Sequence, residues 1–513
     1  MKIINRFEAT VKKNPNTLAV IDNDREVSFQ QLREKALKIG EAVRERLGGM
    51  INQPVSIFLS ESADYVAAIL GVLYSGNFYV PLIKNGAKSL LKTVIESINP
   101  QVIITDFESA GALVRCAISI SKQLVLEEVY EEVLDEDPIV EEYRKITDKD
   151  PVYIMHTSGS TGVPKGVVIS HGGLVDYVEW VGKTFQMDAT KRIGSKTSFA
   201  FDNSVLDIFS MVFYGSLLVL KYPKEKKPDL KKVLFKMLQE IKEHRINLIF
   251  WVPLYLKLFA DHDIFQEGVP ANLKQVLFCG EVMHNKHLNY WRKHLPDTQY
   301  ANLYGPTEVT DVCSYYIVNR PFSDDEPLPI GKACENMSVL ILNDDLKLIE
   351  PGESGEIYVR GTGVALGYWQ NPFETAKVFV QNPLHNDYSD ICYKTGDLGT
   401  YNAYGEILFL GRKDTQIKYF GTRIELGEIE VAACAMEGIE DCVVLFDSQE
   451  AVMTLVYQAS SEIEKLEIMR FLHDKVTAVP TRYVHMKKFP LNNSGKVDRV
   501  TLRGLLREKL NGN

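Results

Sequence analysis

Short apolar runs of strand length alternate with helix-like apolar patterns through most of the chain, and this alternation constrains the fold more than any other feature. The run at 55–59 is followed by a helical pattern over 64–76, and the run at 78–82 by another over 88–98. Short continuous apolar runs between helices are typical of strands that are buried on both faces of a largely parallel sheet. The sequence therefore predicts α/β construction, and the same rhythm returns at 216–222, 248–252 and 276–280.

The pattern changes after about residue 330, where short strands and turns replace the longer helices. The last segment begins near Asp414, contains a helical run over 427–437 and ends in a tail rich in Lys and Arg. A chain of 513 residues is long enough for about two to four domains. We therefore predict a large domain over 1–412 and a smaller C-terminal domain over 413–513.

The charge of the chain is concentrated in one place. There are 58 Lys and Arg against 68 Asp and Glu, a formal net charge of −10, and nine acids without a base lie in 127–142. We interpret this stretch, and the basic stretch 221–232, as solvated connectors, with carrier docking as the alternative for the basic one. Because nucleic-acid binding needs a surplus of Lys and Arg, this class of function is disfavoured.

The cysteines indicate a reduced protein. All seven are widely spaced, none forms a Cys-x-x-Cys pair, and the number is odd, so neither a disulfide framework nor a zinc site is predicted. We expect Cys434 and Cys442 in the core of the C-terminal domain. The amino terminus has no apolar leader and no run of about 18 apolar residues follows, which predicts a cytoplasmic protein without membrane insertion.

A loop rich in glycine and hydroxyl residues follows the strand-like run 153–157. Such a loop offers backbone N–H groups, hydroxyls and one ammonium, which are the groups that bind phosphates. It does not match the Walker A pattern. A flexible linker is the alternative, and the strand-like runs on both sides disfavour it. The loop consists of Ser158, Gly159, Ser160, Thr161 and Gly162, and Lys165 closes it.

Eight further segments accompany this loop. They are VSFQQL (27–32), LYSGNFYVPL (73–82), FDNSVLD (201–207), NLYGPTE (302–308), GEIYVRG (355–361), YKTGDL (393–398), 411–430 and NSGKVDR (493–499). In kind and order they resemble the signature motifs of the adenylate-forming enzymes, which include amino-acid adenylation domains, acyl-CoA ligases and luciferases. The resemblance implies a large N-terminal domain of mixed sheets flanked by helices, and a small mobile α+β C-terminal domain.

The resemblance also implies a reaction in which a carboxylate attacks the α-phosphate of ATP and pyrophosphate leaves. Such transfers depend on positioning and on neutralising the charge of the phosphates. The β- and γ-phosphates would contact the loop, through Thr157, Ser158, Ser160, Thr161 and Lys165, with Gly159 and Gly162 in its turns. Tyr304 would stack on adenine, and Asn302 would bond the exocyclic amine. Gly280, Glu281, Leu303 and Gly305 would complete the adenosine site.

Five residues would act on the reacting phosphates and the ribose. Thr307 would contact the α-phosphate, and Glu308 would hold Mg²⁺, an ion that prefers oxygen ligands. Asp397 would accept hydrogen bonds from both ribose hydroxyls, with Arg412 beside it. Lys496 would reach the substrate carboxylate and the α-phosphate. Without the resemblance, Asp397 would be interpreted as a turn residue and Lys496 as a surface lysine.

Asp202 indicates which acid is activated. It follows Phe201 at the position where amino-acid-activating members keep an aspartate for the substrate ammonium, and a buried ammonium needs such a partner. A helix N-cap at Asp202 or Asn203 is the alternative role. The resemblance places the rest of the substrate pocket at Asn203, Leu206, Phe250, Leu277, Cys279, Leu303, Asp311 and Val312.

The pocket is mostly bulky and apolar, which predicts a small or medium side chain. Cys279 resembles the D-alanine–D-alanyl carrier protein ligases, which favours D-alanine. Asp311 departs from them, so this acid either selects a polar group on the substrate or is tied up elsewhere in the protein.

We therefore expect a free-standing ligase that forms aminoacyl-AMP with ATP and Mg²⁺. It would pass the aminoacyl group to the phosphopantetheine thiol of a separate carrier protein, since no Gly-x-Ser attachment site follows Lys496. Asp414 would be the hinge of the mobile domain, and Gly421 would line the pantetheine path. The alternatives are an acyl- or aryl-CoA ligase of the same fold and an inactive nucleotide-binding or carrier-docking protein.

Overall fold

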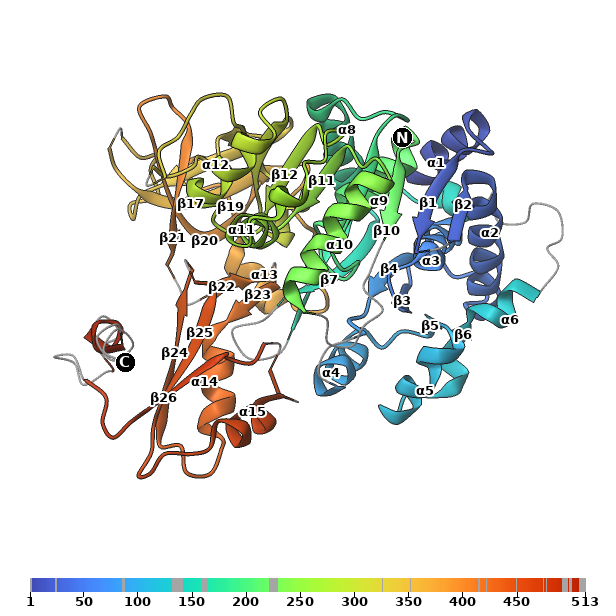
Figure 1. Ribbon diagram of the computed structural model, residues 1–513. Helices are drawn as coiled ribbons and strands as arrows, with labels where there is room; N and C mark the ends of the chain where they lie inside the picture. Colours follow the sequence, from blue (N-terminus) through green and yellow to red (C-terminus); the bar gives the residue numbers. More distant parts are fainter. Residues whose placement is uncertain are drawn as a thin grey trace. The chain divides into compact units, whose positions relative to one another are not determined.

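The computed structural model describes residues 2–23, 25–84, 88–131, 142–157, 164–220, 229–324, 326–350, 352–413, 416–420, 422–448, 450–473, 475–476, 478–490, 497 and 501–506. The chain divides into two compact units. The larger takes in 1–84, 95–157 and 165–413, and the smaller takes in 85–94, 158–164 and 414–513. The α/β construction is confirmed (Figure 1). The assignment of a substrate-binding role to 1–412 and a lid role to 413–513 stays a prediction.

A nine-stranded sheet carries most of the candidate site. Its six central strands are parallel to their neighbours, and antiparallel strands complete both edges. Side chains on a strand alternate between the two faces, and both faces are apolar here: Leu218 joins one hydrophobic cluster and Val219 the other. The strand order is β15 (Lys332–Ala333), β14 (Ser314–Ile317), β13 (Gln299–Tyr304), β12 (Gln275–Cys279), β11 (Leu248–Trp251), β9 (Arg192–Ser195), β10 (Leu217–Leu220), β1 (Leu18–Asp22) and β2 (Arg25–Ser28).

Two further sheets belong to the larger unit. A seven-stranded sheet has the order β18 (Gly367–Tyr368), β8 (Lys165–Ser170), β7 (Pro151–Thr157), β4 (Phe78–Pro81), β3 (Pro54–Phe58), β5 (Val102–Thr105) and β6 (Gln123–Val125). A five-stranded antiparallel sheet contains β16 (Met337–Leu342), β17 (Gly355–Gly361), β20 (Ile391–Tyr401) and β19 (Phe379–Gln381), with β21 (Ile407–Arg412) paired to β20.

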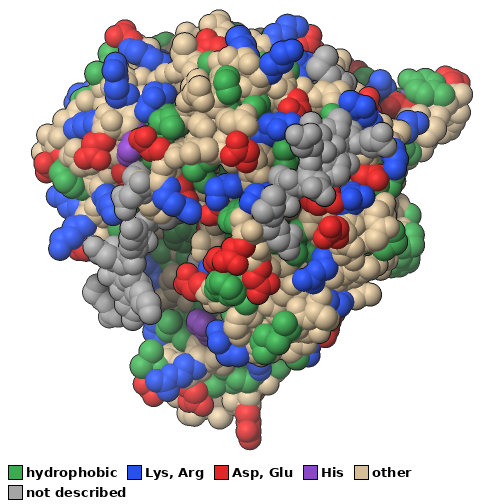
Figure 2. All heavy atoms as spheres, turned by 90° about the vertical axis from the view of Figure 1, so that its right-hand side faces the viewer, with side chains coloured by type: hydrophobic (Ala, Val, Ile, Leu, Met, Phe, Trp, Pro, Cys, Tyr) green, Lys and Arg blue, Asp and Glu red, His purple; other side chains and the backbone are tan. Residues whose placement is uncertain are grey.

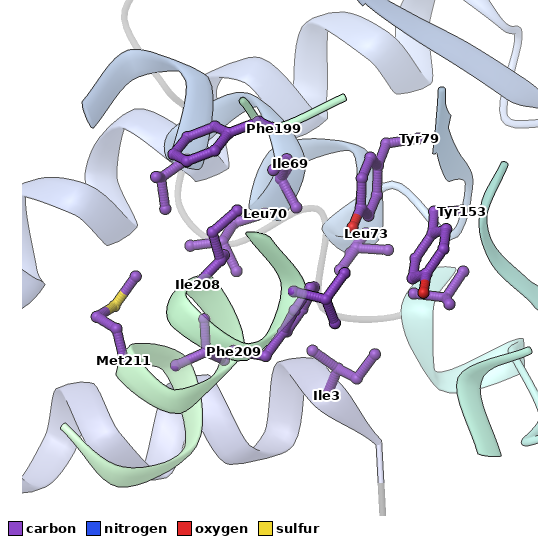
Figure 3. Packing of buried hydrophobic residues seen from close by; sticks show 14 of the residues in the cluster. Ile3, Ile69, Leu70, Leu73, Tyr79, Tyr153, Phe199, Ile208, Phe209 and Met211 are labelled. Atoms are coloured by element: carbon purple, nitrogen blue, oxygen red, sulfur yellow. The ribbon is translucent and has the colours of Figure 1, made fainter. Parts of the chain in front are cut away.

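Five helices share one hydrophobic core with strands from both large sheets. They are α1 (Ile3–Lys13), α2 (Phe29–Arg46), α3 (Ala63–Tyr74), α8 (His171–Phe185) and α9 (Ser204–Tyr214). Figure 3 shows how Leu70 of α3 and Phe209 of α9 lie within this cluster, near Ile3 of α1. Ser28 begins α2 through a capping box with Gln31. Because α3 is apolar all round, it is buried on every side.

The remaining helices of the larger unit belong to other clusters or add single residues to the first one. The second cluster, on the other face of the nine-stranded sheet, includes α10 (Leu230–Glu243), α11 (Pro253–Asp261) and α12 (Asn285–His294). Short helices α6 (Leu126–Glu131) and α7 (Glu142–Lys145) add Leu126, Val129 and Tyr143 to the first cluster. The others are α5 (Phe107–Arg115) and α13 (Pro372–Val378), and α4 (Lys88–Ile98) is divided between the two units. In the described part of the chain no helix is both long and apolar enough to cross a membrane.

The smaller unit is an α+β structure with its own core. A hairpin of β22 (Gln416–Tyr419) and β23 (Thr422–Glu425) leads into α14 (Leu426–Cys434), and a sheet follows of β24 (Asp441–Asp447), β25 (Val452–Gln458) and β26 (Arg482–Met486), with α15 (Lys465–His473). Cys442 is buried as expected, but the expectation of a core position for Cys434 is wrong, because this residue ends α14 and is exposed.

The charged side chains follow the pattern expected of a nearly neutral surface. On the face shown in Figure 2, Lys and Arg side chains are interspersed with Asp and Glu side chains. Of the two stretches interpreted as connectors, 132–141 and 221–228 lie outside the described residues. The start of the acidic stretch, at Glu127 and Glu128, is exposed on α6.

Candidate active site

Two of the residues predicted to bind the nucleoside donate hydrogen bonds to the carboxylate of a third, Asp397. Asp397 on β20 pairs in register with Arg412 on β21, so their side chains leave the sheet on the same face. Arg412 Nη1 donates to Asp397 Oδ1 at 2.5 Å, and the Tyr304 hydroxyl donates to Asp397 Oδ2 at 2.5 Å. Burial and this carboxylate raise the pKa of Tyr304 well above its ordinary value, so the hydroxyl keeps its proton. Each carboxylate oxygen can accept a second hydrogen bond, which is what a vicinal diol requires.

Asn302, which is predicted to contact adenine, lies on the strand that ends at Tyr304. Asn302 on β13 is buried, and its Nδ2 donates to the backbone oxygen of Pro329 at 2.8 Å. That bond orients the amide so that its carbonyl oxygen is the acceptor available to an exocyclic amine. Gly305 is required because a Cβ there would lie 2.2 Å from the backbone oxygen of Asp311. The stacking of Tyr304 on adenine stays a prediction.

Two other residues predicted to bind the nucleotide, Gly280 and Glu281, have local structural roles. Gly280 follows β12 with φ +101°, a conformation that favours glycine. Glu281 accepts a hydrogen bond from the backbone N–H of Leu254 at 3.1 Å, in the first turn of α11. A carboxylate at a helix N-terminus is favourable, so Glu281 has a structural task that the sequence did not indicate.

Thr307 joins the predicted phosphate and amino-acid subsites. Its hydroxyl donates to Asp202 Oδ2 at 2.5 Å, across 105 positions of sequence. Asp202 is half-buried in the turn before α9, and its Oδ1 accepts from the N–H of the adjacent Asn203 at 3.0 Å. No side-chain bond caps this helix. Asn203 stands at the N-cap position of α9 without a capping side-chain bond, and Asp202 precedes that position.

Glu308 is a fully buried carboxylate beside the threonine. It accepts a hydrogen bond from the hydroxyl of Tyr368 on β18 at 2.8 Å. Among the described residues, no group of three or more acids, histidines and cysteines could hold a metal. A single carboxylate fits Mg²⁺, which commonly takes one or two protein ligands and completes its shell with phosphates and water. Tyr368 was not predicted, although it lies in the GYW sequence at 367–369.

The lysine that closes the phosphate loop has an acidic partner. Lys165 is the first residue of β8, and its Nζ lies 2.7 Å from Glu374 Oε2 on α13. Lys377, one turn further along the same helix, pairs with Glu374 as well. These bonds hold the pKa of Glu374 below its ordinary value. The Lys165 ammonium also lies 5.3 Å from the centre of the Tyr368 ring. No feature of the sequence indicated Glu374, because it is 209 positions away.

Thr157 ends β7 and is paired in register with Lys165, so the described ends of the loop are adjacent. Several predicted residues lie outside the described part of the chain: Ser158, Gly159, Ser160, Thr161, Gly162, Asp414, Gly421 and Lys496. Their roles stay predictions.

The predicted substrate pocket follows the carboxyl ends of three neighbouring parallel strands. Phe250 on β11 pairs in register with Leu277 on β12, and Cys279 on β12 pairs with Leu303 on β13. Residues in register lie on the same face, which explains why positions so far apart come together. The pocket residues that belong to the shared hydrophobic core are Leu206, Phe250, Leu277, Cys279, Leu303 and Val312. Phe201 is half-buried beside Asp202, and Asn203 Nδ2 is buried without a hydrogen-bond partner among the described residues.

Asp311 has a partner that the sequence did not reveal. The hydroxyl of Tyr177 on α8 donates to Asp311 Oδ2 at 2.6 Å, and both side chains are buried. Burial and the carboxylate raise the pKa of Tyr177 well above its ordinary value. Of the two roles considered for Asp311, the structure favours an acid that is tied up within the protein.

Solved structures with this architecture identify the fold. PA1221, a protein containing adenylation and PCP domains, has a TM-score of 0.82 at 22% identity, over 98% of this chain and 84% of that one. The Vibrio cholerae adenylation domain AlmE, solved with glycyl-adenosine-5'-phosphate, has a TM-score of 0.81 at 22% identity, over 99% and 98%. The fold is therefore that of the adenylate-forming enzymes.

The sequence comparisons are more specific. The profile of the AMP-binding enzyme family matches residues 7–369, and the chain belongs to this family. Zwittermicin A synthase ZmaJ of Bacillus cereus is 32% identical over 97% of this chain and 93% of its own length. Tyrocidine synthase 1 of Brevibacillus parabrevis is 30% identical over 97% of this chain, which spans 44% of that larger protein. The predicted family, an AMP-forming ligase of the adenylation-domain type, is confirmed.

Proposed function

We propose that the protein activates an amino acid, forming aminoacyl-AMP and pyrophosphate from ATP. The observation that carries this proposal is the bond between Thr307 and Asp202. It brings the predicted α-phosphate contact beside a carboxylate that has no helix-capping task. An amino acid bound there would have its ammonium at Asp202 and its carboxylate towards the α-phosphate. The remaining oxygens of the amino acid and of the nucleotide would lie near the hydrogen-bond donors that were described for the candidate active site.

Different residues would contribute to different parts of the adenylation reaction. Asp397, with Tyr304 and Arg412 holding its oxygens, would bind the ribose diol and fix the nucleoside. Lys165 and Lys496 would offset the charge of the phosphates and of the attacking carboxylate. Mg²⁺, held by Glu308, would neutralise phosphate charge. The protein's contribution is therefore positioning and electrostatics, which can account for most of the acceleration of a phosphoryl-type transfer.

The substrate side chain would be small, with D-alanine as the specific expectation. The predicted pocket residues Phe250, Leu277 and Leu303 are bulky, apolar and buried, which supports this expectation. Asp311 is satisfied in part by Tyr177, which makes a basic side chain on the substrate unnecessary.

The second half-reaction would transfer the aminoacyl group to the phosphopantetheine thiol of a carrier protein in trans. PA1221 contains adenylation and PCP domains, which supports a carrier as acceptor.

Amino-acid-dependent pyrophosphate exchange tests the first half-reaction. The panel contains D- and L-alanine, glycine, serine, a diamino acid, a fatty acid and an aryl acid. We expect exchange with a small amino acid. Silence with every amino acid and turnover with a fatty or aryl acid would instead establish an acyl- or aryl-CoA ligase. No turnover with any acid would establish an inactive nucleotide-binding protein.

Lys496→Ala separates the two half-reactions. It should abolish exchange while a preformed aminoacyl-AMP is still transferred to carrier, as intact-protein mass spectrometry would show. Equal loss of both half-reactions would contradict a lysine that acts in adenylation alone.

A further inference from the structure

Two cysteines of the smaller unit lie closer together than their positions in the sequence suggest. Cys434 is the last residue of α14, and Cys442 is the second residue of β24. Their Sγ atoms are 3.3 Å apart. A disulfide has an S–S distance of about 2.04 Å, so the sulfurs would need to approach by a little more than about 1 Å.

The contacts around the pair hold the two elements in place. Cys442 Sγ lies 3.2 Å from the backbone oxygen of Glu430, and Glu430 Oε1 accepts a hydrogen bond from the N–H of Val444 at 2.8 Å. Cys442 and Val444 also pack in the same hydrophobic core as Ala433 of α14. The helix and the strand that carry the two sulfurs are therefore packed against each other.

The two thiols differ in their surroundings. Cys434 is exposed, whereas Cys442 is about 5% exposed. Burial, and the neighbouring Cys434 thiol, raise the pKa of the Cys442 thiol well above its ordinary value. A dissolved oxidant therefore reacts with Cys434 first, whereas the Cys442 thiol is shielded from the oxidant by burial. This is the arrangement of a reacting and a resolving cysteine.

We propose that Cys434 and Cys442 form a reversible thiol pair, which a peroxide oxidises to a disulfide within the smaller unit. The Cys434 thiolate attacks one peroxide oxygen, the O–O bond breaks, and a sulfenic acid forms as hydroxide leaves; this hydroxide takes up the proton that the Cys434 thiol had released and becomes water. Cys442 Sγ then attacks the Cys434 sulfur, the S–O bond breaks, and the departing hydroxide takes the Cys442 proton. The two sulfurs lose two electrons, and hydrogen peroxide is reduced to two molecules of water. A dithiol reverses the reaction by thiol–disulfide exchange.

The other cysteines provide internal controls. Cys279, Cys313, Cys334 and Cys392 are buried, and Cys116 is partly exposed. Cys116 should react with an alkylating reagent at the same rate before and after mild oxidation, because the described residues bring no second cysteine sulfur to it as they do to Cys434. The inference does not depend on the proposed function, since none of its measurements involves adenylation.

The experiment treats the reduced full-length chain with hydrogen peroxide, then with N-ethylmaleimide, and maps the peptides by mass spectrometry. We expect a peptide pair joined through Cys434 and Cys442 and lighter by two hydrogen atoms. Alkylation of Cys434 should fall by about tenfold or more and return with dithiothreitol, whereas that of Cys116 should not change.

Two variants keep the inference falsifiable. In Cys442→Ser, Cys434 should accumulate as sulfenic and sulfinic acid, because the resolving thiol is absent. Cys434→Ser changes an exposed side chain, so the chain should fold, and Cys442 should then stay unmodified. Equal over-oxidation of Cys434 in the wild type and in Cys442→Ser would overturn the proposal. So would a cross-link that joins two chains on a non-reducing gel.

Discussion

Replacing Asp202 by Asn tests the proposed recognition of the substrate ammonium. The amide has the shape of the carboxylate, and its oxygen can still accept the hydrogen bond that Thr307 donates at 2.5 Å. The substitution therefore removes the charge and leaves the contact to the phosphate subsite in place.

The size of the effect follows from burial. Removing one partner of a buried charge pair costs about 3–5 kcal/mol. Asp202 is half-buried, so the lower value, about 3 kcal/mol, applies. At about 1.4 kcal/mol for each factor of ten, kcat/KM for the amino acid should fall by about two orders of magnitude.

Pyrophosphate exchange with an amino acid and with its des-amino analogue gives the measurement, for example alanine and propionate. The loss should be confined to the amino acid, since propionate has no ammonium to pair. Asp188→Asn is the matched control, because Asp188 is exposed and bonds to Thr190. Equal loss with both acids, or no loss with the amino acid, would refute the assignment of Asp202.

Three further predictions concern Tyr177, Glu374 and Asp207. Tyr177→Phe removes a donor to the buried Asp311 carboxylate and should lower the free energy of unfolding by about 1.5–3 kcal/mol in urea; an unchanged midpoint would show that the bond contributes nothing. Glu374→Gln removes the carboxylate that nucleotide phosphates would have to displace from Lys165, and should lower KM for ATP about threefold; a raised KM would mean that Glu374 positions the lysine productively. Burial raises the pKa of the Asp207 carboxyl group to about 7. The native state therefore keeps a proton that the unfolded chain releases near pH 4. As a result, the free energy of unfolding decreases as pH rises from about 4 to about 7. Asp207→Asn should flatten this loss, with a gap to the wild type on the order of 4 kcal/mol at pH 8; parallel urea curves at pH 5 and pH 8 would contradict it.

The local patterns predicted the elements well where burial was complete. The apolar run at 55–59 matches β3, and the helical pattern that follows it matches α3. Prediction failed where a residue stood at the end of an element. Cys434 has the apolar neighbours of a core position, yet it is the last residue of α14 and faces solvent. Periodicity describes the middle of a helix and says little about its final turn.

Among the candidate site residues, too, some could be predicted from the sequence and others could not. The motifs indicated Asp202, Thr307, Glu308 and Asp397 as candidate site residues, because each of them lies in a short segment of characteristic residue types. The partners of Glu308, Asp311 and Lys165 were not identifiable, since Tyr368, Tyr177 and Glu374 come from other segments of the chain.

The sequence by itself determined the α/β class, the family and most of the residue types that a nucleotide and an amino acid would need. It could do so because strand and helix periods, and the chemistry of a short motif, are local properties of the chain. Only the tertiary structure decided that β1 lies beside β10, that Thr307 donates to Asp202 and that Cys434 meets Cys442. Neighbours in a sheet and side chains across a packed interface are chosen by the burial of whole faces, which no single segment encodes.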